Sequence, residues 1–344
     1  MSAETAQPLV PKSFVTRKLP LNLRDEDIAL FNDDLQRVIP ETRLFEFSNV
    51  RITPEGILLN GYRVLPESFA FPTNFNSWKF RSRIKLLVGN LLSQKRNFTR
   101  EVLWIVNDWS TGYFHWLCDA LSKLYVMREH LDQLVLMLPY AYERLDFVRS
   151  SLCCFTSASP EFIGSNQVVR CEKVVMPSET APPGHYNEEI VRGVRAVICR
   201  AYGDTAYEGP GQRLYISRSR AAKRKITNED EILPVLNSYG FERFYAEDFS
   251  FAQQVKIFSR TRYIVSNHGA GLTNMLFAPE ASNILELRQA GDRIRNYYFG
   301  LSSALNHNYF YQTCQTEPGS EPHFADLMVD PVSLEANLRL LVTP

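Results

Sequence analysis

The 344-residue sequence has little of what marks several common classes of protein. Its 38 Lys and Arg residues equal its 38 Asp and Glu residues, so net charge gives no argument for binding nucleic acid or an anionic membrane. There is no apolar run near the ~20 residues that span a bilayer, and residues 1–14 lack the apolar core of a signal peptide. The six cysteines form no C-x-x-C pair and show no zinc spacing. These absences favour a cytoplasmic protein with reduced thiols.

Two familiar nucleotide-binding motifs are also missing. G-x-G-x-x-G fails because Asn274 stands at the third glycine position, and no G-K-[ST] follows as a P-loop requires. A different glycine-rich turn is present, His268-Gly269-Ala270-Gly271, between the apolar run Tyr263–Val265 and a short helix expected at Leu272–Ala278. Backbone amides and the positive end of a helix at such a turn suit a phosphate group. The plainer alternative is a structural turn that binds nothing.

Glu286 lies in the next apolar run, Ile284–Leu287. In nucleotide-binding α/β units, a carboxylate after the next strand accepts hydrogen bonds from ribose hydroxyl groups. Glu286 is therefore a candidate ribose ligand.

The order of the elements predicts two α/β halves. Hydrophobic residues make up 45% and charged residues 22% of the chain, as in soluble globular proteins. Short apolar strands alternate with helical patterns such as Tyr113–His130 and Asn187–Tyr202, and the alternation restarts at the strand Leu214–Ser217. Such alternation favours parallel sheets. We predict a loose polar arm at 1–20, an N-terminal domain at 21–205, a C-terminal domain at 206–330 and a final helix at 331–344.

A histidine and an aspartate share one side of the helix Tyr113–His130. His115 and Asp119 are four positions apart, so both side chains face the same way. The helix follows a glycine turn after a strand, which is where open α/β sheets place ligands. An imidazole beside a carboxylate can transfer a proton, with one group accepting it and the other orienting the first. An ordinary helical pair remains the alternative.

A cationic loop follows the strand Leu214–Ser217. Five cations fall within eight positions, namely Arg218, Arg220, Lys223, Arg224 and Lys225. Guanidinium groups match phosphate in bidentate geometry, and lysines add point charge. A solvated basic loop is the alternative; a nucleic-acid patch is disfavoured because no aromatic residues are interleaved.

Taken together, these stretches resemble glycosyltransferase family 61, which includes plant, animal and bacterial enzymes. The resemblance covers about residues 100–312, and the first hundred residues carry no matching motif. The matching motifs, in chain order, are Tyr113-Phe114-His115-Trp116-Leu117-x-Asp119, Ile216-Ser217-Arg218 with Lys225 and Asn228-Glu229, His268-Gly269-Ala270-Gly271-Leu272-Thr273-Asn274, Ile284–Leu287 with Glu286, Tyr297-Tyr298, and His307.

The resemblance implies a GT-B fold, with two Rossmann-like domains facing across a cleft. It implies an inverting, metal-independent transfer from a nucleoside-diphosphate sugar, most often a UDP sugar, with the donor as co-substrate and no further cofactor. In the N-terminal half, Asp119 would deprotonate the acceptor, with His115 orienting it or serving as the second choice of base. The implied donor-binding residues are Arg218, Lys225, His268, Gly269, Ala270, Gly271, Leu272, Asn274 and Glu286.

A formal D-x-D motif, Asp25-Glu26-Asp27, raises the question of a metal. In metal-dependent sugar-nucleotide enzymes this motif ends a buried strand and holds a divalent cation. Here polar residues precede it and a helical pattern, Asp25–Ile39, follows, and carboxylates in a first helical turn are favoured by the dipole. We therefore expect a helix start and no metal ligand.

Within the family, the lack of a signal or anchor favours a bacterial cytoplasmic enzyme of capsule or lipopolysaccharide synthesis. Its acceptor would be a glycan or glycolipid, and a peripheral association with the inner face of the membrane stays open. One alternative is a non-catalytic nucleotide-sugar-binding or scaffold protein. Another is a nucleotide-dependent oxidoreductase, which the missing G-x-G-x-x-G disfavours. The sugar, the nucleotide, the linkage position and the oligomeric state are left undetermined by the sequence.

Overall fold

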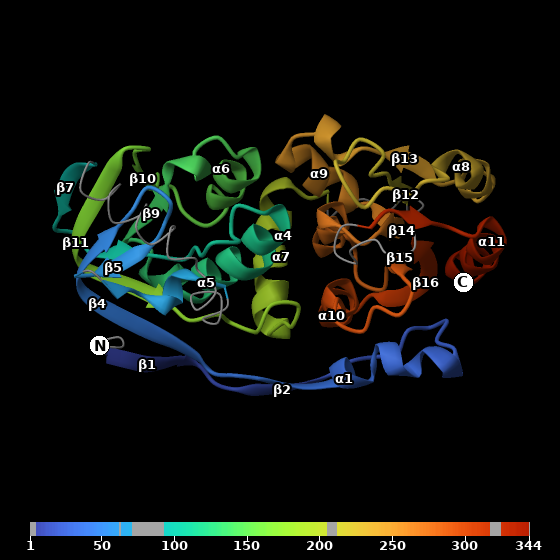
Figure 1. Ribbon diagram of the computed structural model, residues 1–344, viewed down its shortest axis with the longest axis horizontal. Helices are drawn as coiled ribbons and strands as arrows, with labels where there is room; N and C mark the ends of the chain where they lie inside the picture. Colours follow the sequence, from blue (N-terminus) through green and yellow to red (C-terminus); the bar gives the residue numbers. More distant parts are fainter. Residues whose placement is uncertain (1–4, 62, 71–92, 205–211, 317–324, 344) are drawn as a thin grey trace. The chain divides into compact units, whose positions relative to one another are not determined.

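The computed structural model describes residues 5–61, 63–70, 93–204, 212–316 and 325–343. Contacts divide the chain into two compact units: unit 1 is Met1–Ser13 with Ile39–Pro183, and unit 2 is Phe14–Val38 with Gly184–Pro344 (Figure 1). Each unit combines helices with a main β-sheet, so the predicted mixed α/β class is confirmed. The predicted boundary between residues 205 and 206 lies outside the described residues.

The sheet of unit 1 is mixed, and its long strand β11 (Gln167–Pro177) joins a parallel part to an antiparallel part. The parallel part consists of β7 (Gln94–Phe98), β8 (Val102–Leu103), β9 (Val135–Pro139) and β10 (Glu161–Ile163). The antiparallel part consists of β1 (Thr5–Val10), β4 (Thr42–Ile52), β5 (Leu58–Asn60) and β6 (Arg63–Val64). The candidate residues of unit 1 follow the parallel strand β8.

The helical segment predicted at Tyr113–His130 is present between β8 and β9, with a change of helix type in its middle. It runs as α4 (Tyr113–His115), the π-helical turn η3 (Trp116–Ala120), α5 (Leu121–Val126) and the 3₁₀ turn η4 (Arg128–His130). The remaining helical pieces of unit 1 are η2 (Pro66–Ser68), η5 (Tyr140–Tyr142) and α6 (Asp146–Leu152). A π-helical turn inside an α-helix is rare and is frequent at functional sites.

The sheet of unit 2 is a doubly wound parallel sheet. Its strands are β12 (Gln212–Ile216), β13 (Glu242–Phe244), β14 (Thr261–Asn267), β15 (Asn283–Gln289), β16 (Asn308–Thr316) and the antiparallel β17 (Leu327–Met328). In space they run β13-β12-β14-β15-β16-β17, so the five parallel strands have the order 2-1-3-4-5. The chain reverses its direction of winding between β12 and β14. Open α/β sheets bind ligands at the carboxyl ends of the strands at this point.

Helices cover both faces of this sheet. α8 (Glu229–Ser238) and α11 (Pro331–Val342), the predicted final helix, pack with Val265 and Leu285 in one apolar cluster. The alternate residues Ile264 and Ile284 are also fully buried, on the opposite face. The other helical elements are α7 (Glu188–Tyr202), η6 (Ala246–Asp248), α9 (Phe251–Phe258), η7 (Ala270–Phe277) and α10 (Tyr297–Ala304).

The segment Phe14–Val38 belongs to unit 2, and the chain from its start to Ile39 differs from two expectations. The predicted helix at Asp25–Ile39 is wrong: the chain forms the 3₁₀ helix η1 (Asp25–Leu30), the short α1 (Asn32–Leu35) and the strand β3 (Gln36–Ile39). Within the predicted loose arm at 1–20, β1 pairs with β4 and β2 (Ser13–Thr16) pairs with β3. Tertiary contacts override the helical pattern, because Phe31 enters an aromatic cluster and Asp34 is buried against Arg17.

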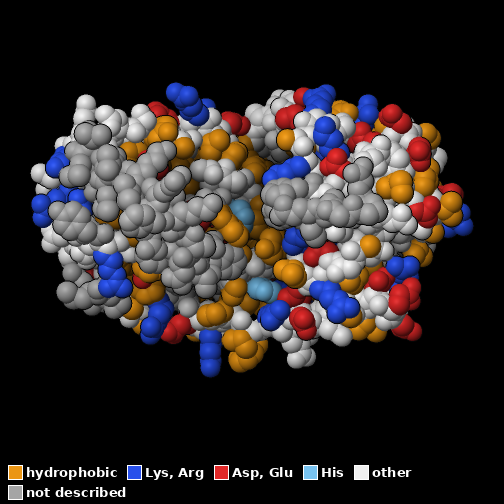
Figure 2. All heavy atoms as spheres, in the orientation of Figure 1, with side chains coloured by type: hydrophobic (Ala, Val, Ile, Leu, Met, Phe, Trp, Pro, Cys, Tyr) orange, Lys and Arg blue, Asp and Glu red, His pale blue; other side chains and the backbone are white. Residues whose placement is uncertain are grey.

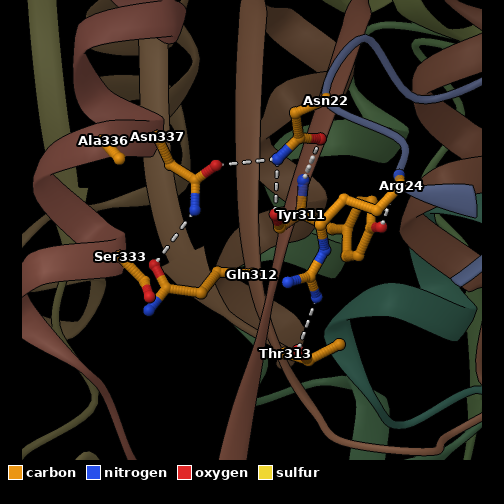
Figure 3. A pocket seen from close by; sticks show the side chains of 8 residues that line it. All are labelled: Asn22, Arg24, Tyr311, Gln312, Thr313, Ser333, Ala336 and Asn337. Carbon is orange, nitrogen blue, oxygen red and sulfur yellow. Dashed lines mark hydrogen bonds between the residues drawn. The ribbon is translucent and has the colours of Figure 1, made fainter. Parts of the chain in front are cut away.

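The same segment is held at the edge of β16 by the side chain of Asn22, which forms with the backbone of Tyr311 the two hydrogen bonds that a neighbouring strand would form. The Asn22 amide donates to the carbonyl of Tyr311 at 2.7 Å, and its oxygen accepts from the Tyr311 amide at 3.1 Å (Figure 3). A polar pocket of about 220 Å³ lies beside it, lined in part by Arg24 and Asn337. Asn22 also donates to Asn337, so side chains of this pocket largely satisfy one another. The Asp27 carboxylate of the D-x-D motif accepts from Arg24 and from the Tyr311 hydroxyl.

Lys and Arg side chains are interspersed with Asp and Glu side chains on the face drawn in Figure 2, as the balanced composition predicts. Among the described residues, there is no helix with both the length and the apolar character needed to cross a membrane.

Candidate active site

The ends of β12 and β14 bring together two of the predicted motifs at the winding reversal of unit 2. The chain leaves β12 toward Arg218 and leaves β14 at His268. The two strands pair side by side, with Ile216 opposite Ser266. The cationic loop and the glycine turn therefore meet where this sheet topology places ligands.

Gly269 is needed because the guanidinium of Arg218 lies directly over it. A Cβ atom at Gly269 would sit 2.4 Å from Nη1 of Arg218, and one at Gly271 would sit 2.9 Å from Cγ2 of Ile216. A hydrogen bond from α10 also fixes the turn, because the Tyr298 hydroxyl donates to the carbonyl of Gly269 at 2.6 Å. After it, Ala270 opens the helix η7, which is 3₁₀ in type. The guanidinium of Arg218 and the glycine turn are therefore packed directly against each other.

Arg218 and Arg224 form a pair of neighbouring cations. Arg218 donates through Nε and Nη2 to the carbonyls of Arg224 and Lys223, both at 3.3 Å. Burial, and then repulsion from Arg224, lowers the pKa of Arg218, and burial lowers the pKa of Arg224. Neither guanidinium forms an ion pair with a carboxylate in the part of the chain that the structure describes. An anion would relieve this uncompensated positive charge.

The backbone at Arg224 directs its side chain toward the histidine of the turn. Arg224 has a φ of 57°, a left-handed conformation that few non-glycine residues adopt. Its carbonyl also accepts a hydrogen bond from Asn267 at 2.5 Å, which ties the loop to the end of β14. Arg224, His268 and Arg295 line a niche of about 10 Å³ together with Asp292, which pairs with Arg295. This volume is the size of one water-sized group. The sequence motifs did not single out Arg224, because nothing in a run of cations tells which one turns inward.

Lys225 lies outside this niche. Its amide donates to Asp326 at 2.8 Å, and the next residue, Ile226, forms a bridge with Leu327. Asn228 stands at the N-cap position of α8 without a side-chain capping hydrogen bond. Its side chain exchanges two hydrogen bonds with the backbone of Val329. The cationic loop is thus anchored to the segment around β17.

Glu286 is enclosed in the protein. Its side chain is 0% exposed; Oε1 lies 2.6 Å from Nδ1 of His268, and Oε2 accepts from the Tyr309 hydroxyl at 2.5 Å. Burial alone would raise the pKa of Glu286, but the hydrogen bond and charge of His268, the charge of Arg288 and the Tyr309 hydroxyl hold it below its ordinary value. The group is therefore a buried carboxylate whose two oxygens already have partners.

Three further residues of the matching motifs are buried supports. Leu272 and Asn274 are fully buried in η7, and the Asn274 amide donates to Gln254 of α9 at 2.9 Å. His307 lies 3.0 Å from the carbonyl of Met275 through Nε2, and burial lowers its pKa to about 4. These contacts hold the helix that follows the glycine turn.

In unit 1, His115 and Asp119 form the predicted pair. Nδ1 of His115 lies 2.7 Å from Oδ2 of Asp119, and the side chains are 20% and 11% exposed. The pair spans the π-helical turn η3, and the Trp109 ring lies 5.0 Å from the His115 ring. Burial raises the pKa of Asp119. Since Nδ1 is engaged, Nε2 is the imidazole nitrogen left to meet a ligand.

A second ion pair beside this dyad was not predicted. Lys123 is 0% exposed, and its Nζ lies 2.5 Å from Oε1 of Glu179, which also accepts from Asn107 at 3.1 Å. Glu179 contributes to the raised pKa of Asp119, and Lys123 opposes it. Lys123 could have been predicted from the sequence, because His115, Asp119 and Lys123 are each four positions apart and so share one side of the helix. Glu179 gave no signal because it follows β11 in an irregular segment.

Comparisons with known proteins agree with the motifs. The family model described as Glycosyltransferase 61 matches residues 113–285, which is half of the chain. Three relatives are each named EGF domain-specific O-linked N-acetylglucosamine transferase. The protein from Drosophila melanogaster is 33% identical over 121 residues, that from Bos taurus 34% over 123, and that from Mus musculus 28% over 123. Each match covers 31% of this chain and 23% of the relative, so less than a quarter of each relative's length is represented.

Proposed function

The chain belongs to glycosyltransferase family 61, and on this premise we propose that it transfers a sugar from a nucleoside-diphosphate donor to a hydroxyl group of an acceptor. The observation that carries the proposal is the uncompensated pair Arg218 and Arg224 at the winding reversal of unit 2, beside the glycine turn. A diphosphate supplies the negative charge that these groups lack. The resemblance favours UDP as the nucleotide.

The proposed donor set keeps part of the sequence prediction, adds Arg224, and leaves out Glu286, which is fully buried. Arg218, His268 and the amides of residues 269–272 would surround the diphosphate, and Arg224 would join them. As the bond between the sugar and the phosphate breaks, negative charge grows on the leaving diphosphate, and preorganised cations and amides stabilise that charge most. This set substitutes for a metal in the proposed mechanism. Leu272 and Asn274 would act by supporting the turn, and Lys225 by adding charge at a greater distance.

The proposed acceptor group is the dyad of unit 1. The sequence put Asp119 first as the base; the geometry favours His115, because its Nδ1 faces Asp119 and leaves Nε2 for the acceptor. The acceptor hydroxyl would give its proton to Nε2, its oxygen would bond to the anomeric carbon, and the nucleoside diphosphate would leave from the opposite face. Asp119 would orient the imidazole and stabilise its charged form. Inversion at the anomeric carbon and a GT-B arrangement of the two units are parts of this proposal.

The identity of the sugar is best approached from the relatives. Their names specify N-acetylglucosamine, so we propose a hexosyl donor and place UDP-N-acetylglucosamine first among those to test. The resemblance supports a glycan or glycolipid acceptor and a place in capsule or lipopolysaccharide synthesis. These finer assignments, and the cytoplasmic or peripheral membrane location, stay predictions.

A melting-temperature screen tests the function. The chain is mixed with UDP, GDP, their sugars and NAD. For each sugar donor that binds, release of its own nucleoside diphosphate, UDP or GDP, is then measured. A donor at a hundred times its Kd should raise the melting temperature by about 5 °C through mass action. Binding without UDP release in the presence of glycan acceptors would indicate a binding or scaffold protein. A shift with NAD alone would indicate an oxidoreductase and remove the proposal.

Replacing Arg224 by asparagine should weaken UDP binding about tenfold, because a charge-assisted hydrogen bond to phosphate is lost. Asparagine is chosen because it tolerates the left-handed backbone better than alanine. Calorimetry gives the Kd. Arg220→Asn is the matched control: Arg220 is exposed and paired with Asp248, so its loss should leave the Kd unchanged. If Lys225→Asn weakens UDP more than Arg224→Asn does, the wrong cation has been assigned to the niche.

A further inference from the structure

The carboxylate behind the glycine turn is enclosed, and each of its oxygens has a partner within the protein. Glu286 is fully buried in the sheet, and its two oxygens accept hydrogen bonds from His268 and Tyr309. Direct binding of ribose would require this enclosed group to become accessible first. The carboxylate is instead placed to act on the histidine, which lies between it and the cationic niche.

The hydrogen bonds determine which nitrogen of His268 carries a proton. Burial opposes the charge of Glu286, but His268, Arg288 and Tyr309 keep its pKa low, so the group accepts and does not donate. The Tyr309 hydroxyl must donate to Oε2, since burial and the adjacent carboxylate raise its own pKa well above the ordinary value. Nδ1 of His268 therefore carries the hydrogen shared with Oε1. Nε2 has no hydrogen-bond partner among the described residues, and the ring lines the niche with Arg224.

Nε2 can meet a phosphate oxygen in only one of its two states. Unprotonated, it presents a lone pair that repels the oxygen; protonated, it donates a charge-assisted hydrogen bond. We infer, building on the proposed function, that Glu286 is a positioning residue: it holds His268 through Nδ1, and the diphosphate of the donor binds with a proton taken up at Nε2.

The surrounding charges explain why the proton should arrive with the ligand. A bound diphosphate brings negative charge next to the ring, and that charge favours a donor over a lone pair at Nε2. The charged and titratable groups around the ring, its carboxylate partner and the adjoining turn are Glu286 and Arg288 on β15, Tyr309 on β16, Tyr297 and Tyr298 on α10, Arg218 and Arg224 after β12, and Asp292 and Arg295 after β15.

Two ligands distinguish a positioning role from direct ribose binding. We expect Glu286→Gln to raise the Kd of UDP and of inorganic pyrophosphate by the same factor, about tenfold, because the phosphate contact through His268 weakens. If Glu286 instead bound the ribose directly, Glu286→Gln would raise the Kd of UDP and leave the Kd of pyrophosphate unchanged. That result would overturn the inference. Adding His268→Gln to the Glu286→Gln variant should raise these Kd values little further, because the two residues act as one unit.

Proton uptake is measured by titrating UDP calorimetrically in buffers of different ionisation enthalpy. At pH 7.5 we expect the wild type to take up roughly 0.3–1 proton per UDP more than His268→Gln. The comparison with this variant subtracts the small proton release from the terminal phosphate, which itself titrates near pH 6. If Glu286→Gln fails to fold, Tyr309→Phe and His268→Gln still decide the matter. Tyr309→Phe keeps the carboxylate and should retain the uptake.

The outcomes separate this inference from the proposed function. Tight binding of UDP with equal proton uptake in the wild type and His268→Gln would remove the role of Glu286 and leave a glycosyltransferase. Failure of the wild type to bind UDP, other nucleotides and pyrophosphate would remove both.

Discussion

Replacing His115 by alanine is expected to lower kcat by about 10²–10⁴-fold, which is the usual contribution of a general base. The Kd for UDP should stay within about twofold, because the proposed donor groups lie in unit 2 and His115 in unit 1. Initial rates of UDP release with a saturating acceptor give kcat, and calorimetry gives the Kd.

The companion variant Asp119→Asn decides which member of the dyad is the base. If His115 accepts the proton, Asp119→Asn should retain more activity than His115→Ala, since only the orientation and charge of the imidazole are disturbed. If Asp119→Asn loses more activity than His115→Ala, Asp119 is the base, as the sequence first indicated. Glu129→Gln serves as the control, because that side chain is 77% exposed on η4. A kcat within fivefold of the wild type for His115→Ala would exclude the dyad from the reaction.

Local patterns in the sequence predicted elements whose stability is mainly local. The helix predicted at Asn187–Tyr202 is α7, and Asn187 caps it by accepting from the Ile190 amide. The turn from β14 into η7 was also visible, because an apolar run followed by two glycines has few other structures available. The spacing of four between His115 and Asp119 placed the two side chains together even though a π-helical turn intervenes.

Features set by distant contacts were missed for a physical reason. The pattern at Asp25–Ile39 has a helical period, but burial of Phe31 and Asp34 within unit 2 and pairing of β3 with β2 gave a different structure. The role suggested for Glu286 came from its place near the end of the apolar run that follows the glycine turn. Only the structure revealed that Tyr309, from the next strand, and His268 occupy both of its oxygens. Partners from other strands leave no mark on the local sequence.

Arg224 illustrates the limit within a motif. Five cations in a short loop indicate an anion site, and the family resemblance singled out Arg218 and Lys225, but the sequence gives no reason to choose Arg224. The choice is made by the backbone at Arg224, whose left-handed φ follows from anchoring of its carbonyl by Asn267 and Arg218 and of the next residue by Asp326. The density of cations in the sequence therefore predicted an anion site. Which of these cations faces the site is set by the backbone of the folded loop.

Replacing Arg218 by alanine is expected to lower kcat/KM by about 10²–10³-fold, because a preorganised cation beside the leaving diphosphate is lost. Arg218→Lys should recover part of this loss, since a lysine keeps the charge but lacks the two-pronged guanidinium. The loss should appear mostly in kcat if the contact strengthens in the transition state, and in the Kd of UDP if it does not. Steady-state kinetics and calorimetry on the same preparations separate the two.

Gly269→Ala provides an independent route to the same effect without touching the charge. The added Cβ would lie 2.4 Å from Nη1 of Arg218, so the guanidinium must leave its place over the turn. Most of the loss seen in Arg218→Ala should therefore recur, and the double variant should be little worse than either single one, because both changes remove one contact. Gly164→Ala is the control for a glycine replacement, since its Cβ would meet only ordinary contact, 3.5 Å from Cβ of Gln167. If Gly269→Ala keeps wild-type kcat/KM while Arg218→Ala does not, the arginine acts from a position away from the turn, and the phosphate site must be sought elsewhere along the cationic loop.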